Sequence, residues 1–158
     1  MIKTIIILLI NLHFVIMQEC PPQDTLNVVS VQNDWDIEYI NNWEKLEVMT
    51  WNIKTFPLNE NTLNDVQEII SDLMPDIINF QEIWDPNTYQ NLSNMLEAYE
   101  FILSPDGGWS GLGIAYRKDC VNLIDYSTLF NEYGYEFAWR YPLKANMEWH
   151  CGESYMEF

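Results

Sequence analysis

The chain has 158 residues, of which 48% are hydrophobic and 15% aromatic, which is enough apolar material for the core of one domain. Its formal net charge is −17, with 24 acidic side chains against 7 basic ones. So acidic a surface repels polyanions and argues against broad non-specific binding to nucleic acid, whereas a divalent cation held by carboxylates stays compatible with it.

The N-terminus has the pattern of an export signal. Lys3 precedes an apolar run over residues 5–17 that only one asparagine and one histidine interrupt. The run is too short for a membrane-spanning helix, which needs about 20 apolar residues. We therefore expect a signal peptide at 1–19, an acidic leader at 20–45 and a folded domain at 46–158, in a secreted or periplasmic protein that has no stable membrane insertion after signal removal. A hydrophobic anchor that is never removed is the alternative.

Export would place the three cysteines, Cys20, Cys120 and Cys151, in an oxidising compartment. Because three is an odd number, Cys120 could pair with Cys151 and leave Cys20 spare or paired elsewhere. The sequence has no Cys-x-x-Cys motif, and neither histidine lies at zinc-ligand spacing from a cysteine, which argues against a structural zinc.

From residue 46 onward the pattern predicts strands that alternate with two helices and then a run of strands. Thr62 and Asp65 resemble a capping box at the start of the first helix, and Asp85-Pro86 predicts the N-cap and first position of the second. Apolar residues recur at helical spacing in both, at Leu63, Val66, Ile69, Ile70 and Leu73 and at Tyr89, Leu92, Leu96 and Tyr99. The expected strands cover residues 46–50, 76–80, 101–103, 112–118, 121–130, 140–149 and 154–158. This order predicts an α/β fold that begins with a βαβ unit and continues in antiparallel pairs.

The βαβ unit brings two polar side chains toward one crevice. Asn52 is expected at the end of the first strand and Glu82 at the end of the second. Because parallel strands end at the same edge of a sheet, both side chains open on the edge where ligands bind in α/β folds. A carboxylate there suits Mg²⁺, and a carboxamide can donate to an oxyanion or fix a neighbouring carboxylate. The alternatives are a strand-ending asparagine and a solvated glutamate near a helix start.

Four segments carry a resemblance to a known family. "VMTWNI" at 48–53 and "PDIINFQEI" at 75–83 are similar to the opening of the endonuclease/exonuclease/phosphatase superfamily, in which a Trp-Asn pair ends the first strand and a Gln-Glu pair follows on the next. "GLGIAYRKD" at 111–119 and "RYPL" at 140–143 resemble later segments of that family more weakly.

The resemblance implies a four-layer α/β-β/α sandwich of which this chain holds part, and a Mg²⁺-dependent hydrolase, with Mn²⁺ as an alternative metal. Carried over by position, Glu82 would be the metal ligand and Asn52 the polar residue beside metal and phosphate. Arg140 matches an arginine that approaches the substrate backbone in some members; a surface or packing arginine is the equal alternative. The implied partner is a phosphate-ester substrate, either nucleic acid or a phospholipid headgroup.

The family's later motifs, which supply the catalytic histidine and the aspartate that activates water, are not found in the sequence. His150 precedes "CGE", which reads as a turn, so it does not match that histidine. We therefore expect a fragment that covers the N-terminal part of the domain and is itself inactive. The competing interpretation is a secreted non-catalytic binding module with an aromatic-rich core. The substrate stays open between DNA, RNA, lipids and small phosphoesters.

Overall fold

The computed structural model describes residues 35, 37, 45–105, 110–151 and 154–158. The expected signal peptide and almost all of the acidic leader lie outside these residues. The elements in chain order are β1 (Val48–Phe56), α1 (Thr62–Leu73), β2 (Ile77–Ile83), α2 (Pro86–Met95), β3 (Tyr99–Leu103), β4 (Gly111–Arg117), β5 (Val121–Thr128), β6 (Leu143–Cys151) and β7 (Ser154–Glu157). None of the helices in these residues is both long and apolar enough to cross a membrane.

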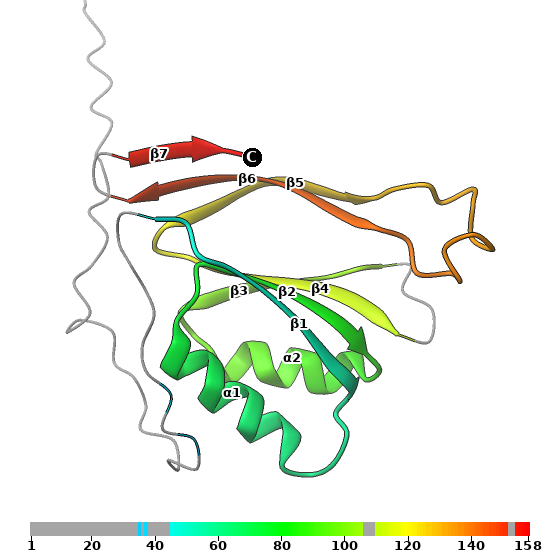
Figure 1. The fold of residues 1–158 in the computed structure, drawn as a ribbon, viewed down its shortest axis with the longest axis horizontal. Coiled ribbons are helices and arrows are strands. Elements are labelled where there is room, and N and C mark those ends of the chain that lie inside the picture. Colours follow the sequence, from blue (N-terminus) through cyan, green and yellow to red (C-terminus); the bar gives the residue numbers. More distant parts are fainter. Residues whose placement is uncertain (1–34, 36, 38–44, 106–109, 152–153) are drawn as a thin grey trace, which may run out of the picture.

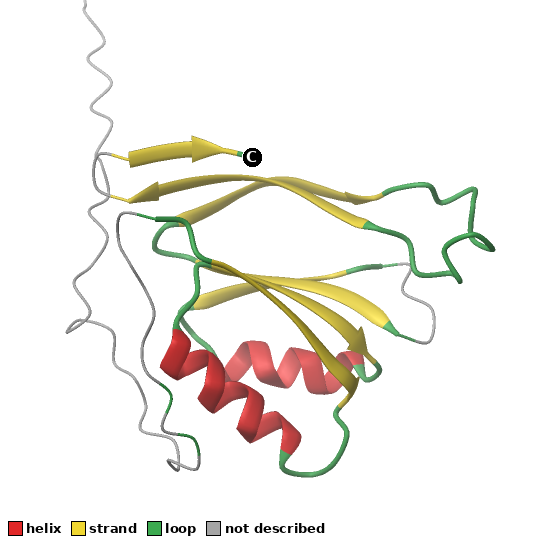
Figure 2. Cartoon of the chain, in the orientation of Figure 1, coloured by secondary structure: helices red, strands yellow, loops and turns green. Residues whose placement is uncertain are grey.

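The strands form two sheets that face each other, and both helices cover the outer side of the first sheet (Figure 1, Figure 2). The first sheet has the order β1-β2-β4-β3 and the second β5-β6-β7. β1 and β2 are parallel, as the predicted βαβ unit requires, and the other pairs are antiparallel. The part of the chain that the structure describes therefore forms one layer of helices and two layers of sheet. These are three layers of the expected four-layer sandwich.

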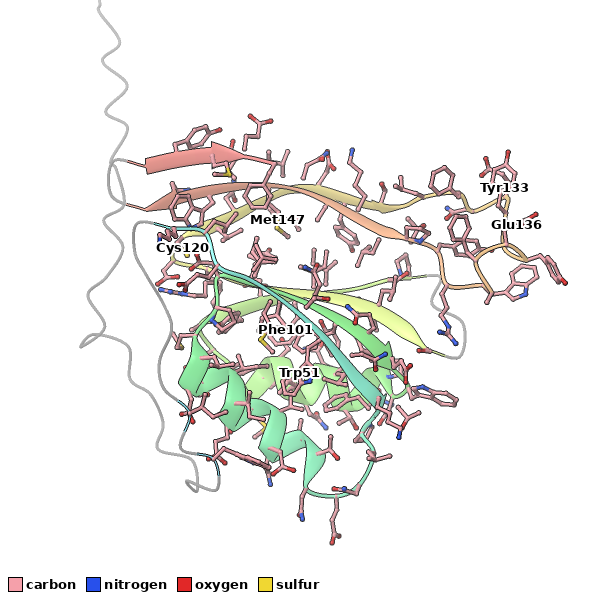
Figure 3. All side chains as sticks on the ribbon, in the orientation of Figure 1. Trp51, Phe101, Cys120, Tyr133, Glu136 and Met147 are labelled. Atoms are coloured by element: carbon pink, nitrogen blue, oxygen red, sulfur yellow. The ribbon has the colours of Figure 1, made fainter. Side chains whose placement is uncertain are left out.

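Successive side chains of β2 point to opposite faces of the first sheet, so they belong to two hydrophobic cores, one under the helices and one between the sheets. Ile78 and Phe80 point toward the helices, whereas Ile77 points toward the second sheet. Trp51 and Phe101 pack on the helix side and Met147 packs between the sheets (Figure 3). Burial on both faces explains why β2 reads as an almost continuous apolar run.

The starts of the two helices differ from each other in how they are capped. Asp85 caps α2 as predicted: its carboxylate accepts hydrogen bonds from the Thr88 hydroxyl at 2.6 Å and from the Asn87 N–H at 3.0 Å. These two donors lower the pKa of Asp85. The predicted capping box at Thr62 is wrong, because Thr62 is the first residue of α1 and not its cap.

The residue that stabilises the start of α1 is Asn59. Its Oδ1 accepts from the N–H groups of Asn61, at 2.9 Å, and of Thr62, at 3.2 Å. The Thr62 hydroxyl accepts in return from the Asn59 N–H at 3.0 Å. A side-chain turn thus replaces the reciprocal contact between Thr62 and Asp65 that spacing had suggested.

A buried polar network closes the other end of β2, around Asp76. Asp76 as a whole residue is 4% exposed. Its Oδ2 accepts from the Glu47 N–H at 3.0 Å and from the Trp149 indole N–H at 3.2 Å. Its Oδ1 accepts from the Cys120 thiol at 3.3 Å and lies 3.5 Å from a guanidinium nitrogen of Arg117. One carboxylate therefore ties the first sheet to the second.

The same network corrects the expectation for the cysteines. Cys120 is a free, buried thiol that donates to Asp76, so it does not form the suggested disulfide with Cys151. Arg117 is also held by Asp119, whose carboxylate accepts from both its Nε and a terminal nitrogen. Burial raises the pKa of the Cys120 thiol, and the neighbouring Asp76 carboxylate raises it further.

Candidate functional site

Both strands that bear the predicted site residues distort at their carboxyl ends. Asn52 lies within β1 and not at its end, because β1 continues to Phe56. The ladder between β1 and β2 pairs Asn52 with Gln81 and then Phe56 with Ile83, so the three residues 53–55 oppose Glu82 alone. The ladder between β2 and β4 shifts over the same stretch, between Phe80 and Ile83. Glu82 is thus the residue around which both neighbouring ladders lose register.

The distortion is visible in the backbone of three residues that are not glycine. Lys54, Thr55 and Glu82 have φ values of 33°, 54° and 64°. Left-handed backbone costs about 1–2 kcal/mol per residue with a side chain. Such residues cluster at functional sites, where the surrounding structure holds them in place. Here they turn the Glu82 side chain toward β1.

The two predicted residues meet through their side chains. Asn52 Nδ2 donates to Glu82 Oε1 at 3.0 Å, and the Thr55 N–H donates to Glu82 Oε2 at 3.3 Å. Asn52 is itself oriented, because its Oδ1 accepts from the Lys54 N–H at 2.9 Å. Asn52 is exposed and Glu82 half-buried, so the pair is open to solvent. Each carboxylate oxygen of Glu82 keeps a lone pair for a further partner.

We call Asn52, Thr55 and Glu82 the rim of this edge of the first sheet. The oxygen atoms that the rim offers suit a hard cation. Mg²⁺ takes oxygen ligands and usually keeps several waters, so that one or two carboxylates from the protein suffice. Glu82 offers such a carboxylate, fixed by two donors, and Asn52 offers a further amide oxygen. Among the described side chains, no three of His, Cys, Asp and Glu come together in a cluster that could hold a metal ion. Glu82 therefore belongs to no such cluster of acidic side chains in the part of the chain that the structure describes.

Arg140, the third predicted residue, lies apart from this pair. It is exposed in the connection between β5 and β6, residues 129–142, where its N–H donates to the Phe137 carbonyl at 2.9 Å. No contact between Arg140 and either Asn52 or Glu82 is seen in the described residues. β6 begins at Leu143 and not at the predicted residue 140. The role of Arg140 toward a substrate stays a prediction.

The connection over residues 129–142 is rich in exposed aromatic side chains. It projects beyond the second sheet at the end of the sandwich where β1 and β2 also end (Figure 1), and Tyr133 and Glu136 lie near its tip (Figure 3). Phe130 and Phe137 stack with their ring centroids 5.5 Å apart, while Tyr135 is 87% exposed and Trp139 60% exposed. The aromatic residues therefore do not all serve the core.

A pocket lined by Ile83 and Trp84, the two residues that follow Glu82 in the sequence, is a feature that the sequence did not indicate. It has a volume of about 220 Å³. Among the described residues, its lining comes from the end of β2, the start of α2, the end of β3 with the two residues after it, and the start of β4, namely Ile83, Trp84, Pro86, Leu103, Ser104, Pro105 and Gly111. The only signals in the sequence are the tryptophan after "QEI" and the Ser-Pro pair at 104–105, and neither reveals that these residues line one pocket.

The fold and rim together define a two-sheet α/β protein with a hydrogen-bonded amide and carboxylate on two neighbouring parallel strands. Residues 49–154 match the model of the Endonuclease/Exonuclease/phosphatase family. The chain belongs to this family, whose members are phosphoester hydrolases. The comparison with curated proteins gave no significant match.

Solved structures support the fold assignment. Danio rerio TDP2 in complex with a single-strand DNA product is 20% identical, with a TM-score of 0.57 over 71% of this chain and 44% of that one. A humanized D. rerio TDP2 is 24% identical, with a TM-score of 0.54 over 66% and 42%. Truncated Caenorhabditis elegans TDP2 is 21% identical, with a TM-score of 0.51 over 71% and 43%. The chain thus spans less than half the length of these proteins.

Proposed function

We propose that this chain carries the metal-binding rim of a secreted, Mg²⁺-dependent phosphodiesterase or nuclease-like hydrolase. The observation that supports the proposal is the hydrogen bond of 3.0 Å between Asn52 on β1 and Glu82 near the end of β2, in a chain of this family. In such a site Glu82 is the ligand of the cation, and Mn²⁺ can replace Mg²⁺. The cation, when bound, supplies Lewis-acid polarisation of the phosphoryl oxygens.

Each residue of the rim has a definite task in this proposal. The Thr55 N–H and the Asn52 amide hold the Glu82 carboxylate in one orientation, so that no reorganisation is needed when the metal binds. The amide nitrogen of Asn52 carries a second N–H, which can donate to a phosphoryl oxygen of the substrate. Arg140 is proposed to contact the substrate backbone from the 129–142 connection. The general base and the catalytic histidine are not assigned to any residue of this chain.

A metal titration of the whole chain tests the proposal. A cation that binds only the folded protein raises stability by RT ln(1 + [Mg²⁺]/Kd), about 2.7 kcal/mol at one hundred times Kd. We expect MgCl₂ to raise the melting temperature and Glu82→Gln to abolish the rise. Glu100→Gln is the matched control, because Glu100 is an exposed glutamate on β3. A melting temperature that Mg²⁺ leaves unchanged, or a rise that survives in Glu82→Gln, would contradict the proposal.

A second function, a non-catalytic binding module, is favoured by the exposed aromatic residues of the 129–142 connection. The same titration separates the two functions, because a binding module has no reason to respond to Mg²⁺ through Glu82. Hydrolysis of bis(p-nitrophenyl) phosphate gives the second readout. Turnover that depends on Mg²⁺ and is lost in Glu82→Gln would exclude the binding module and show that the chain is sufficient for catalysis.

A further inference from the structure

The 129–142 connection is a closed loop whose backbone is held by its own hydrogen bonds. The Leu129 N–H donates to the Pro142 carbonyl at 2.9 Å, so the two ends of the loop meet at its base. Within the loop the Trp139 N–H donates to the Gly134 carbonyl at 2.7 Å. A Cβ on Gly134 would clash with the Trp139 ring, so this ring packs on the Gly134 backbone. Compact surface loops of about 6–16 residues with ends that meet are frequently functional.

Three residues of this loop hold a left-handed backbone although each has a side chain. Phe130, Ala138 and Trp139 have φ values of 59°, 50° and 60°. Such a backbone is unfavourable for any residue other than glycine. None of the three belongs to either hydrophobic core of the described residues. The strain therefore serves what the loop presents to the outside and not the packing of the sandwich.

The loop presents aromatic rings. Tyr135 is 87% exposed and Trp139 60%, and about half of Phe130 and of Tyr133 is exposed as well. Phe130 is fixed in spite of its exposure, because it stacks on Phe137 with the ring centroids 5.5 Å apart. Rings that their neighbours already hold lose little conformational freedom on binding, so the loop is prepared to bury them against a partner.

The shape of the loop favours a soft partner over a second folded protein. The loop projects beyond the second sheet, and Tyr133 and Glu136 lie near its tip (Figure 1, Figure 3). A stable protein interface buries about 800 Å² on each partner, and a projecting tip offers a flat surface much less than that. A lipid layer instead closes around a protruding tip. Tyr and Trp rings are enriched at the level of the headgroups, where one part of the ring is apolar and the other polar.

Charge selects the kind of lipid surface. The loop carries Glu132 and Glu136 against Arg140, and the whole chain has a net charge of −17. Anionic lipids attract basic segments, so they would repel this chain, as the phosphates of a polynucleotide would. A phosphatidylcholine headgroup has no net charge and exposes its ammonium group to water. Carboxylates and aromatic faces both attract such an ammonium group.

We propose that the 129–142 connection docks the protein on a zwitterionic membrane surface rich in phosphatidylcholine, with its exposed rings in the headgroup layer. The docking is peripheral and reversible, because it buries far less apolar surface than a spanning helix does. The loop lies at the end of the sandwich where β1 and β2 also end, so docking turns that end toward the lipid (Figure 1). The proposal uses no metal and no residue of the rim, and it therefore goes beyond the proposed function.

The emission of Trp139 tests the docking in the whole chain. A local readout is needed, because the apolar run over residues 5–17 can bind lipid by itself. The difference between the spectra of the wild type and of Trp139→Phe reports this one indole. In EDTA, we expect vesicles of brominated phosphatidylcholine to quench it, and less so when phosphatidylserine replaces part of the phosphatidylcholine. A chain that floats with the vesicles while the Trp139 emission stays unquenched binds through another part, and this result would overturn the inference.

Tyr135→Ala measures how much one ring contributes. We expect the affinity for the vesicles, taken from titrations of the Trp139 signal, to fall about 3- to 30-fold, because the exposed part of a ring no longer leaves water. The melting temperature should not change, since Tyr135 is exposed. Tyr155→Ala is the matched control: this exposed tyrosine of β7 pairs with His150, near the end of β6 that lies away from the loop. Equal affinities in Tyr135→Ala and in the wild type would contradict the proposal.

Two soluble probes separate the membrane surface from other partners. Free phosphocholine should not displace the protein from the vesicles, and displacement would show recognition of the headgroup alone. A single-stranded oligonucleotide should leave the Trp139 emission unchanged, and a saturable response to it in place of the vesicles would make the loop a nucleic-acid surface and overturn the inference. Glu82→Gln should dock as the wild type does, so a failure of the metal site and a failure of the docking surface are distinguishable.

Discussion

The carboxylates at the two ends of β2 differ in their burial and in their hydrogen-bond partners. Asp76, just before the strand, is buried and surrounded by donors from the Glu47 backbone, Trp149, Cys120 and Arg117. Glu82, at the end of the same strand, is half-buried and held by two donors on a left-handed backbone. The first acid has its bonding capacity filled by the protein, whereas the second keeps capacity for a partner from solution.

The comparison shows what separates a structural acid from a candidate ligand. Asp76 links the two sheets and its removal would expose buried donors without partners. Glu82 lies where both neighbouring strand ladders lose register, and its backbone is strained. The structure shows no buried contact that this strained backbone makes possible. Strain without a structural return is expected where function selects the geometry.

The largest expected effect comes from changing the two acids to their amides. Asp76→Asn breaks a buried ion pair and presents an amino group to donors, so we expect the free energy of unfolding to fall by about 3–5 kcal/mol. Glu82→Gln should change it by less than about 1 kcal/mol, because an exposed pair contributes little. Urea denaturation of both variants measures the difference. Equal losses in the two variants would show that the ends of β2 are not distinct.

The next effect concerns pH and the thiol that donates to Asp76. Burial raises the pKa of Cys120, whereas the thiol of the unfolded chain ionises near pH 8.5. Above that pH the unfolded state has lost a proton that the native state keeps, so stability falls as pH rises, by up to about 1.4 kcal/mol per pH unit. Between about pH 8.5 and 10, before the tyrosines ionise, Cys120→Ala should flatten this slope in urea titrations. Identical slopes in the variant and in the wild type would rule the thiol out.

The smallest effect probes the strained turn beside Glu82. Lys54 is exposed and has a φ of 33°. Glycine adopts a positive φ without strain. We therefore expect Lys54→Gly to leave the free energy of unfolding unchanged or to raise it by up to about 1 kcal/mol. Lys118→Gly is the control: Lys118 is exposed in the turn between β4 and β5, with no positive φ, and glycine should cost about 0.5–1 kcal/mol. Thermal melts of the two variants should shift in different directions. A similar loss in both would mean that the turn is not strained.

Much of the fold follows from periodicity and turn chemistry in the sequence. The apolar runs before Asn52 and Glu82 predicted the parallel strands, and Asp85-Pro86 placed the start of α2 correctly. The convergence of Asn52 with Glu82 followed from the βαβ rule alone. Their roles toward metal and substrate stay predictions.

The features that were missed depend on tertiary contacts. Lys54 and Thr55 are not residues that favour a left-handed backbone, so nothing local indicates the register shift around Glu82. Asp76 and Arg117 meet only because β4 runs antiparallel to β2, where the Arg117 N–H donates to the Asp76 carbonyl at 2.9 Å. Thr62 fits a cap and a first helical turn equally well, and only the neighbouring Asn59 decides between them.

The two ends of β2 also differ in how far along the chain their partners lie. The bond from Asn52 to Glu82 spans 30 positions, and the bond from Trp149 to Asp76 spans 73. By loop-closure entropy the longer link costs about 0.8 kcal/mol more to form, and contacts of low sequence separation favour fast folding. We therefore expect the contact between Asn52 and Glu82 to form earlier in folding than the contact between Trp149 and Asp76. The contact between Asn52 and Glu82 lies within the first βαβ unit, whereas the contact between Trp149 and Asp76 needs a strand of the second sheet.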